Sequence, residues 1–336
     1  MINARRIALV TVALSRAQFI AGADAGINYA NGQVDWIRSE GGYFSPKLEF
    51  RHFNKADPKS AMGVFAAEDV PRGESLMVIP RDCLLTSGES STNICDTAHN
   101  LIVEYRLGDE SDFAPYVQYL FGTAKPGHLP SNWSEAGKDL LRTVIRRELL
   151  SRDPMDVSFE GNCGGSGDPL EELAYHLVHS RSWDDKMVPV FDMVNHGNGR
   201  LSNVDTNSVH RGRDIFAFAS RDIYAGEQLA FLYYECTDCG AFADTYGLLD
   251  MIGDFGIVEA YPQRWILHVD GARSLMFDLD VRDHNDHGDG SAQLEVRCIS
   301  KKPGNLQMGF LRGHLKRLRG LRKVVSERDR HLVSGH

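Results

Sequence analysis

The sequence predicts an α+β fold, because short strand patterns come first, a block of helical spacing follows, and strand patterns then return. The predicted strands lie at 47–51, from 61 to the Pro71-Arg72-Gly73 turn, and at 75–79, 187–191, 215–219 and 228–233. A parallel sheet would alternate strands with helices along the whole chain. The observed order therefore argues against a parallel βαβ architecture.

The first 32 residues are expected to form an N-terminal extension. Arg5 and Arg6 precede an apolar run at 7–14, and the small residues at 23–25 resemble a cleavage site. Together they have the outline of a targeting segment. The apolar run is short, however, and Arg16 interrupts the residues after it. A frayed or helical N-terminal extension is therefore favoured, and a cleaved targeting segment is the alternative.

The helical block is predicted as an insert at about 88–185, which splits a domain at 33–253. Ser134-Glu135 indicates the start of one helix, and the spacing of apolar residues predicts another at 170–179. The glycine-rich stretch at 161–167 is expected to be a loop between them.

Residues 254–336 are expected to form a short C-terminal region. Strands are predicted at 265–269 and 274–279, and a loop at 283–290. A basic helix with one leucine-rich face is predicted at 310–331. We expect its leucines to pack on the domain and its arginines to face water; binding of an acidic partner or nucleic acid is the alternative.

The composition limits the classes of partner that we expect for this chain. Lys and Arg number 37 and Asp and Glu 46 in 336 residues, a net charge of −9. This acidic excess argues against a general electrostatic grip on nucleic acid. No apolar run reaches the roughly 18 residues of a membrane span, so we expect no membrane partner. The protein is expected to act as a monomer.

The cysteines bear on location and metal binding. All six are scattered, which predicts reduced thiols and an intracellular location, in cytoplasm, nucleus or plastid. Cys236 and Cys239 form a C-x-x-C pair, but no second pair accompanies them. A structural zinc site needs four ligands, so we predict no metal.

Two segments offer side chains for a polar site. Asp192 lies three residues before Asn195-His196 at the end of a hydrophobic strand, and amide and imidazole groups there can hold a polar ligand. Tyr233 ends another strand, and Tyr246 follows 13 residues later. Phenol hydroxyls are neutral hydrogen-bonding groups at neutral pH. Taken singly, the segments also fit a capped turn and two core tyrosines.

Further short motifs accompany these two. In chain order they are Trp36…Gly41…Ser45-Pro46-Lys47, Gly63-Val64-Phe65-Ala66, Gly73-Glu74, Phe113-Ala114-Pro115-Tyr116, Leu129-Pro130…Trp133-Ser134, Ser180-Arg181-Ser182-Trp183, Asp192…Asn195-His196, Ala225-Gly226-Glu227-Gln228 and Tyr246-Gly247. In this order, over about 33–250, the sequence resembles the SET-domain protein methyltransferases of the Rubisco large-subunit methyltransferase class. The resemblance implies a SET fold, with small β-sheets around a pseudo-knot in which the chain after the active-site tyrosine threads under an earlier segment.

The resemblance also implies S-adenosylmethionine (S-adenosyl-L-methionine) as cofactor. It assigns the cofactor contacts to Met62, Gly63, Ser180, Arg181, Asp192, Asn195 and His196. Arg181 with Ser180 would hold the carboxylate, to which a guanidinium fork is well matched. Glycine fits at 63, because close approach of the backbone to a ligand leaves no room for a Cβ. Asp192 would serve either the cofactor or the fold.

The same resemblance assigns the catalytic roles to Tyr233 and Tyr246. Tyr234 is the neighbouring alternative to Tyr233, but one residue further along a strand the side chain faces the other way. The implied function is methyl transfer to a lysine side chain of a protein substrate. Histidine methylation is the alternative acceptor chemistry. A non-catalytic protein-binding module with the same fold is the alternative from another class.

Overall fold

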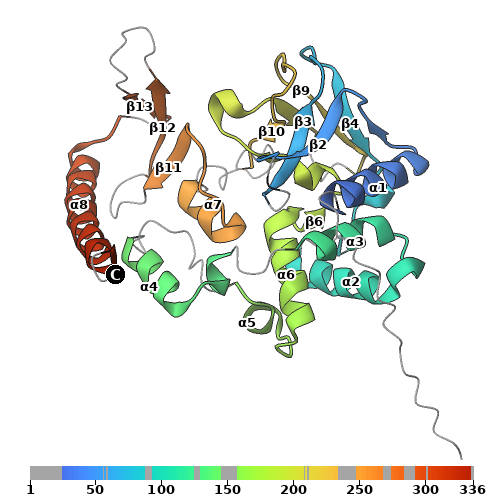
Figure 1. Ribbon diagram of the computed structural model, residues 1–336, viewed down its shortest axis with the longest axis horizontal. Helices are drawn as coiled ribbons and strands as arrows, with labels where there is room; N and C mark the ends of the chain where they lie inside the picture. Colours follow the sequence, from blue (N-terminus) through green and yellow to red (C-terminus); the bar gives the residue numbers. More distant parts are fainter. Residues whose placement is uncertain are drawn as a thin grey trace, which may run out of the picture.

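The structure is a computed structural model. The sheets formed by the first strands lie above a group of helices at the right of Figure 1, and the C-terminal region lies at the left. The structure describes residues 25–55, 57, 60–87, 93–124, 129–144, 157–207, 209, 212–233, 247–267, 274–283, 292–299 and 302–333. Residues 1–24, which hold most of the possible targeting segment, and Tyr246 lie outside these residues. So does the segment 234–246, which would form the thread of the pseudo-knot.

Two antiparallel sheets hold the N-terminal strands. The larger has the order β1 (Tyr43–Phe44), β4 (Ser75–Ile79), β9 (Ile215–Ala219) and β8 (Val204–Thr206). The smaller pairs β2 (Leu48–His52) with β3 (Met62–Ala66). Along β9 buried and exposed side chains alternate, as expected for a strand with one face on the core. The predictions at 75–79 and 215–219 are confirmed to the residue.

The helix α1 (Ala25–Ser39) precedes these strands in the chain and packs against β1 and β2. Its buried residues Ala30, Gln33, Val34 and Ile37 recur at helical spacing on one face. Gln33 is fully buried, and its side-chain oxygen accepts a hydrogen bond from the backbone N–H of Val190 at 3.3 Å. α1 therefore reaches into the segment that leads to the predicted site.

The predicted insert is helical. Its helices are α2 (Ile94–Leu107), α3 (Ala114–Thr123), α4 (Glu135–Val144), α5 (Phe159–Cys163) and α6 (Pro169–Arg181). The longer helices begin at sequence caps: Asn93 and Asp168 accept hydrogen bonds from the N–H groups of Cys95 and Leu170. α6 packs along α2 and ends under the sheets, so it delivers Ser180 and Arg181 to the centre of the molecule.

Three expectations about this part of the chain are wrong in detail. At 187–191 the strand stops at Met187, because Pro189 has no N–H to donate to a ladder, and a short 3₁₀ helix occupies Phe191–Met193. At 228–233 only β10 (Ala230–Phe231) is a strand, since the N–H of Tyr233 donates to the His196 ring instead. The predicted loop at 161–167 begins only at Gly164, after α5.

The C-terminal region confirms both predicted strands and adds a third. β11 (Gln263–Leu267), β12 (Leu275–Asp283) and β13 (Ala292–Cys298) form an antiparallel sheet beside α7 (Leu248–Phe255). Residues 284–290, most of the predicted loop, lie outside the described residues. The boundaries proposed at 32/33 and 253/254 both fall within helices, α1 and α7, and the division into domains stays a prediction.

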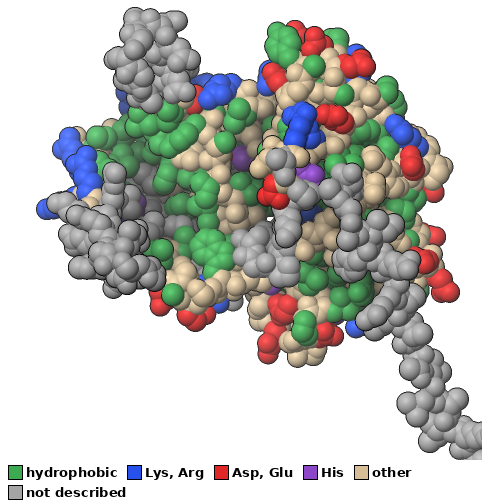
Figure 2. Space-filling view, in the orientation of Figure 1, with side chains coloured by type: hydrophobic (Ala, Val, Ile, Leu, Met, Phe, Trp, Pro, Cys, Tyr) green, Lys and Arg blue, Asp and Glu red, His purple; other side chains and the backbone are tan. Residues whose placement is uncertain are grey.

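The predicted basic helix lies within α8 (Asn305–Val333). Leu311 packs into a cluster with Leu249 and Leu275, whereas Leu315 is 49% exposed. The expected burial of its leucine face is therefore confirmed in part for the side chains that are described. Lys and Arg side chains gather over α8 at the left edge of Figure 2. None of the helices in the described parts of the chain is long and apolar enough to cross a membrane.

A disulfide joins two elements of the helical block. Cys95 of α2 and Cys163 of α5 are bonded, with Cα atoms 5.5 Å apart and a sequence separation of 68 residues. The expectation of reduced cysteines is wrong for this pair: scattered spacing conceals two side chains that the packing of α2 and α5 brings together. Disulfides persist best in oxidising compartments. The bond therefore does not support the intracellular location, which stays a prediction.

Reduction of this disulfide is expected to destabilise the protein without unfolding it. Closing a loop of 68 residues removes chain entropy equivalent to about 4 kcal/mol from the unfolded state. We expect the denaturant midpoint of Cys95→Ser to fall toward that of the reduced wild type. Urea titrations with and without dithiothreitol measure this. An unchanged midpoint on reduction would contradict the contribution of the bond.

Candidate active site

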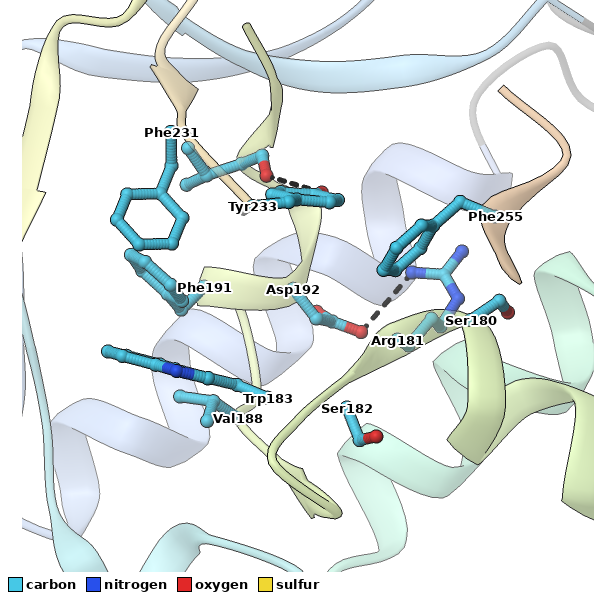
Figure 3. Close-up of a pocket in the computed structure, with 11 residues that line it drawn as sticks. Ser180, Arg181, Ser182, Trp183, Val188, Phe191, Asp192, Phe231, Tyr233 and Phe255 are labelled. Carbon is cyan, nitrogen blue, oxygen red and sulfur yellow. Dashed lines mark hydrogen bonds and ion pairs between the residues drawn. The ribbon is translucent and has the colours of Figure 1, made fainter. Parts of the chain in front are cut away.

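A cavity opens where the end of α6 meets the segment before β7 (Asn195–His196) and the end of β10. The open space between its walls, including solvent at its mouth, has a volume of about 490 Å³. Its lining comes from segments far apart in sequence, as Figure 3 shows. The lining residues are Ser180, Arg181, Ser182, Trp183, Val188, Phe191, Asp192, Val194, Phe231, Tyr233 and Phe255.

An ion pair forms the polar end of the cavity. Arg181 Nη1 lies 3.2 Å from Asp192 Oδ2. The carboxylate side chain is 1% exposed, whereas the guanidinium side chain is 26% exposed at the cavity. Tyr116 donates its hydroxyl to the same carboxylate oxygen at 3.2 Å. Arg181 also donates to the Tyr119 hydroxyl at 3.3 Å.

The surroundings of the pair determine its charges. Burial is the largest influence on Arg181 and disfavours its charge, but Tyr119 and Asp192 outweigh it and raise the pKa of the guanidinium. Burial raises the pKa of the Asp192 carboxyl, and Arg181 opposes that rise. Asp192 therefore depends on Arg181 for its ionised form, while the guanidinium keeps its charge and its exposed edge.

A strained turn aims Asp192 at this position. Val190, two residues earlier, has φ 64°, in the left-handed region that β-branched residues rarely adopt. Its N–H donates to Gln33 in α1, and the 3₁₀ turn that begins at Phe191 comes directly after it. Backbone strain of this kind persists where the surrounding structure enforces it, commonly at functional sites.

Tyr233 contributes a phenol to the lining of the cavity. Its Oη donates to the backbone oxygen of Val194 at 2.8 Å, and Figure 3 shows the ring between Phe231 and Phe255. Burial raises the pKa of the Tyr233 phenol, and the charge of Asp192 adds to the effect. The hydroxyl therefore keeps its proton at neutral pH and acts as a hydrogen-bonding group.

The Asn195-His196 segment contacts both Tyr233 and β3. As β7 (Asn195–His196) it pairs in parallel with β10. The amide of Asn195 donates to the backbone oxygen of Met62 at 3.1 Å, and His196 Nδ1 accepts from the N–H of Tyr233 at 3.1 Å. The segment thus ties β3 to the residues just after β10, which include Tyr233.

Gly63 faces the same segment at close range. A Cβ at this position would lie 2.7 Å from Asn195 Nδ2 and 2.9 Å from Gln228 Nε2. Both distances are shorter than real Cβ contacts, and Asn195 is fixed by its hydrogen bond to Met62. The glycine therefore permits a close approach of β3 to the Asn195-His196 segment.

Replacing Gly63 with alanine is expected to displace the Asn195 amide from Met62. We expect a loss of stability of about 1–3 kcal/mol from overpacking and weaker binding of any ligand that uses this backbone. The matched control is Gly32→Ala in α1, where a Cβ would meet nothing within 4 Å and helix propensity rises. Thermal unfolding of both variants measures the difference. Equal midpoints would contradict the close approach.

Aromatic side chains form the apolar wall of the cavity, and the sequence analysis assigned them no role. Trp183 stacks on Phe191 with ring centroids 5.7 Å apart, and Phe231 lies 5.4 Å from Phe191. Phe255, at the end of α7, lies 5.0 Å from the Tyr233 ring on the other side. Trp183 adjoins the Ser180-Arg181 motif, so the sequence offered a signal for its place in the site. Phe255 stands in no motif, and only the tertiary structure places it in the cavity wall.

The structure brings most of the predicted site residues together. Arg181, Asp192, Ser180 and Tyr233 line the cavity, and the Asn195-His196 segment, Met62 and Gly63 adjoin it through the contacts above. The Ser180 hydroxyl donates to the backbone of His176, one turn earlier in α6. Tyr246 and Tyr234 lie outside the described residues, so the role of Tyr246 and the choice between Tyr233 and Tyr234 stay predictions.

A comparison with protein families decides the classification. The family model described as the SET domain matches residues 61–234, just over half of the chain. The chain belongs to the SET-domain family. The matched segment contains the helical insert, the ion pair and Tyr233, whereas Phe255 lies beyond it. The SET fold predicted from the motif order is thus confirmed.

Solved structures resemble this SET-domain chain at low sequence identity. A structure described as Rubisco LSMT bound to AdoMet is 16% identical, covers 83% of this chain and 68% of its own, and has a TM-score of 0.50. The SET domain of LSMT bound to lysine and AdoHcy is 14% identical, covers 75% and 67%, and has a TM-score of 0.45. The first supports the same fold. No curated protein matches the sequence significantly.

Proposed function

We propose that this SET-domain protein is an S-adenosylmethionine-dependent protein-lysine N-methyltransferase. The observation that carries the proposal is the convergence of Arg181, Asp192 and the Tyr233 hydroxyl on one aromatic-lined cavity. Within a SET fold, such a cavity offers a guanidinium that can bind a carboxylate, together with a hydroxyl of fixed orientation. Family membership, with motifs in register along the chain, supports the same activity.

The residues present fit the proposed cofactor. Arg181 offers a charged, partly exposed guanidinium to the cavity, which suits the carboxylate of an amino-acid moiety. Asp192 Oδ1 and Gln228 Nε2 are buried without a hydrogen-bond partner among the described residues. Buried polar atoms of this kind are otherwise satisfied, so these two favour a polar ligand. Gly63 keeps the backbone of β3 open beside Gln228.

When bound, S-adenosylmethionine supplies an electrophilic methyl group on a sulfonium. The chain's own residues then have to align the acceptor and exclude water. Trp183, Phe191 and Phe231 form an apolar wall that disfavours a charged ammonium, and desolvation lowers the pKa of a lysine amine. The Tyr233 hydroxyl, fixed by the Val194 carbonyl, provides an oriented dipole beside that amine.

The proposed substrate is a lysine-bearing segment of another protein. No cavity-lining carboxylate other than Asp192 lies among the described residues, and Asp192 is held by Arg181 and Tyr116. The neutral amine is therefore favoured over a paired ammonium at the reacting position. The monomeric state and the intracellular site of action remain predictions from the sequence.

Transfer of labelled methyl groups to a whole-cell lysate tests the proposal. We expect label on protein, and mass spectrometry of the modified peptide should place the methyl group on a lysine nitrogen. Label on histidine would overturn the lysine assignment. Binding of S-adenosylmethionine without transfer to any protein would favour a binding module in place of the enzyme.

A further inference from the structure

A buried carboxylate from the C-terminal region contacts the histidine of the active-site segment. Glu259 Oε1 lies 2.9 Å from His196 Nε2, and both side chains are 1% exposed. Glu259 follows α7 and precedes β11, outside the residues 61–234 that match the SET domain. Neither the sequence motifs nor the family match assigns it a role.

The hydrogen bonds around His196 define its tautomer. The backbone N–H of Tyr233 can only donate, so His196 Nδ1, which accepts it at 3.1 Å, carries no proton. The ring proton of the neutral imidazole therefore lies on Nε2, where it is donated to Glu259. A carboxylate at this position stabilises that tautomer and no other.

Glu259 is itself held rigidly. Its second oxygen accepts a hydrogen bond from the backbone N–H of Arg264 at 2.7 Å, and its backbone oxygen accepts one from the side chain of Gln263 at 2.7 Å. Both partners stand at the start of β11. A continuous chain of contacts thus runs from β11 through Glu259 and His196 to the backbone of Tyr233.

We propose that Glu259 is a positioning residue for methyl transfer, which fixes the His196 ring so that it holds Tyr233 in its reactive place. This inference rests on the proposed function. It makes the C-terminal region part of the active site: Phe255 packs on one side of Tyr233, and Glu259 anchors the other through His196.

A double-mutant cycle between Glu259→Gln and Tyr233→Phe tests the proposal. Glu259→Gln alone should lower kcat by roughly 10- to 100-fold, because a small misplacement of a catalytic group costs that much. Its affinity for S-adenosylmethionine by calorimetry should stay within about twofold, since Arg181 and Asp192 are untouched. In the double variant kcat should stay within about twofold of Tyr233→Phe alone, because the hydroxyl that Glu259 positions is already gone. Fully additive effects would overturn the proposal.

Glu172→Gln is the matched structural control. Glu172 of α6 is another glutamate with both carboxylate oxygens hydrogen-bonded, here by the backbone N–H groups of Phe159 and Glu160, and none of the three lines the cavity. The control should lower the melting temperature but leave kcat within about twofold of the wild type. An equal loss of kcat in both carboxylate variants would reduce Glu259 to a structural residue.

An NMR measurement keeps the proposal testable apart from turnover. Long-range proton–nitrogen spectra, with the signal assigned by its loss in His196→Asn, should show His196 as the Nε2–H tautomer in the wild type. In Glu259→Gln this signal should shift or split. The Nδ1–H tautomer in the wild type would overturn the proposal whether or not methyl transfer is observed. A wild type that has the expected tautomer but transfers no methyl groups would instead refute the proposed function.

Discussion

Tyr233→Phe is expected to lower kcat for methyl transfer by about 100- to 1,000-fold, the usual cost of removing one oriented hydrogen-bonding group from a reaction centre. The O–H of Tyr233 donates to Val194, so its oxygen is the atom that can accept a hydrogen bond from the acceptor amine. The variant's affinity for S-adenosylmethionine should stay within about twofold. Tyr233 lines the cavity and its hydroxyl is oriented by the Val194 carbonyl, whereas the ring that packs on Phe255 is unchanged in phenylalanine. Steady-state methyl transfer and calorimetry together separate the two quantities.

Two further tyrosine variants sharpen this prediction. Tyr175→Phe removes a buried hydroxyl of α6 that is bonded to Asn162, away from the cavity, and should leave kcat unchanged. Tyr234→Phe should also leave kcat close to that of the wild type. If Tyr234→Phe is the variant that loses turnover while Tyr233→Phe keeps it, the two tyrosines have exchanged roles, and the assignment of Tyr233 is wrong.

Arg181→Met is expected to weaken binding of S-adenosylmethionine by about 100-fold. Hydrogen bonds to charged groups contribute about 1.5–3 kcal/mol each, and the guanidinium is the charged group that the cavity offers to a carboxylate. The variant should also lose about 3–5 kcal/mol of stability, because the carboxyl group of Asp192, 1% exposed, loses the cation that compensates its burial. Calorimetry measures the first effect and denaturant unfolding the second.

The double variant Arg181→Met with Asp192→Asn separates binding from folding. It removes both buried charges, and Tyr116 can still donate its hydroxyl to the amide oxygen. We expect much of the stability to return while the weak binding persists. Recovery of cofactor affinity together with stability would show that Arg181 matters only for the fold.

The regular strands of the fold could be predicted because local pattern and tertiary structure agree there. β4 and β9 match their predictions to the residue: β9 alternates buried and exposed side chains, and β4 is a short apolar run that is mostly buried. The strand predicted at 187–191 fails for a local reason, Pro189 and the strained Val190. The apolar pattern there reflects burial around the site rather than a ladder.

The residues of the candidate site likewise include some that the sequence could predict and some that it could not. Arg181, Asp192 and Tyr233 stand in motifs that occur in a fixed order, so the resemblance could assign them. Phe255 and Glu259 could not be found, because they reach the site through tertiary contacts with Tyr233 and His196 and leave no periodic or motif signal. The disulfide between Cys95 and Cys163 was missed for a similar reason.

Calorimetric titration of the wild-type chain with S-adenosylmethionine tests the central claim most directly. The account predicts saturable binding at a single site, retained by Tyr233→Phe and lost by Arg181→Met with Asp192→Asn, in proteins that circular dichroism shows to be folded. A folded wild type that binds no S-adenosylmethionine would contradict the account, as would binding that the double variant leaves unchanged.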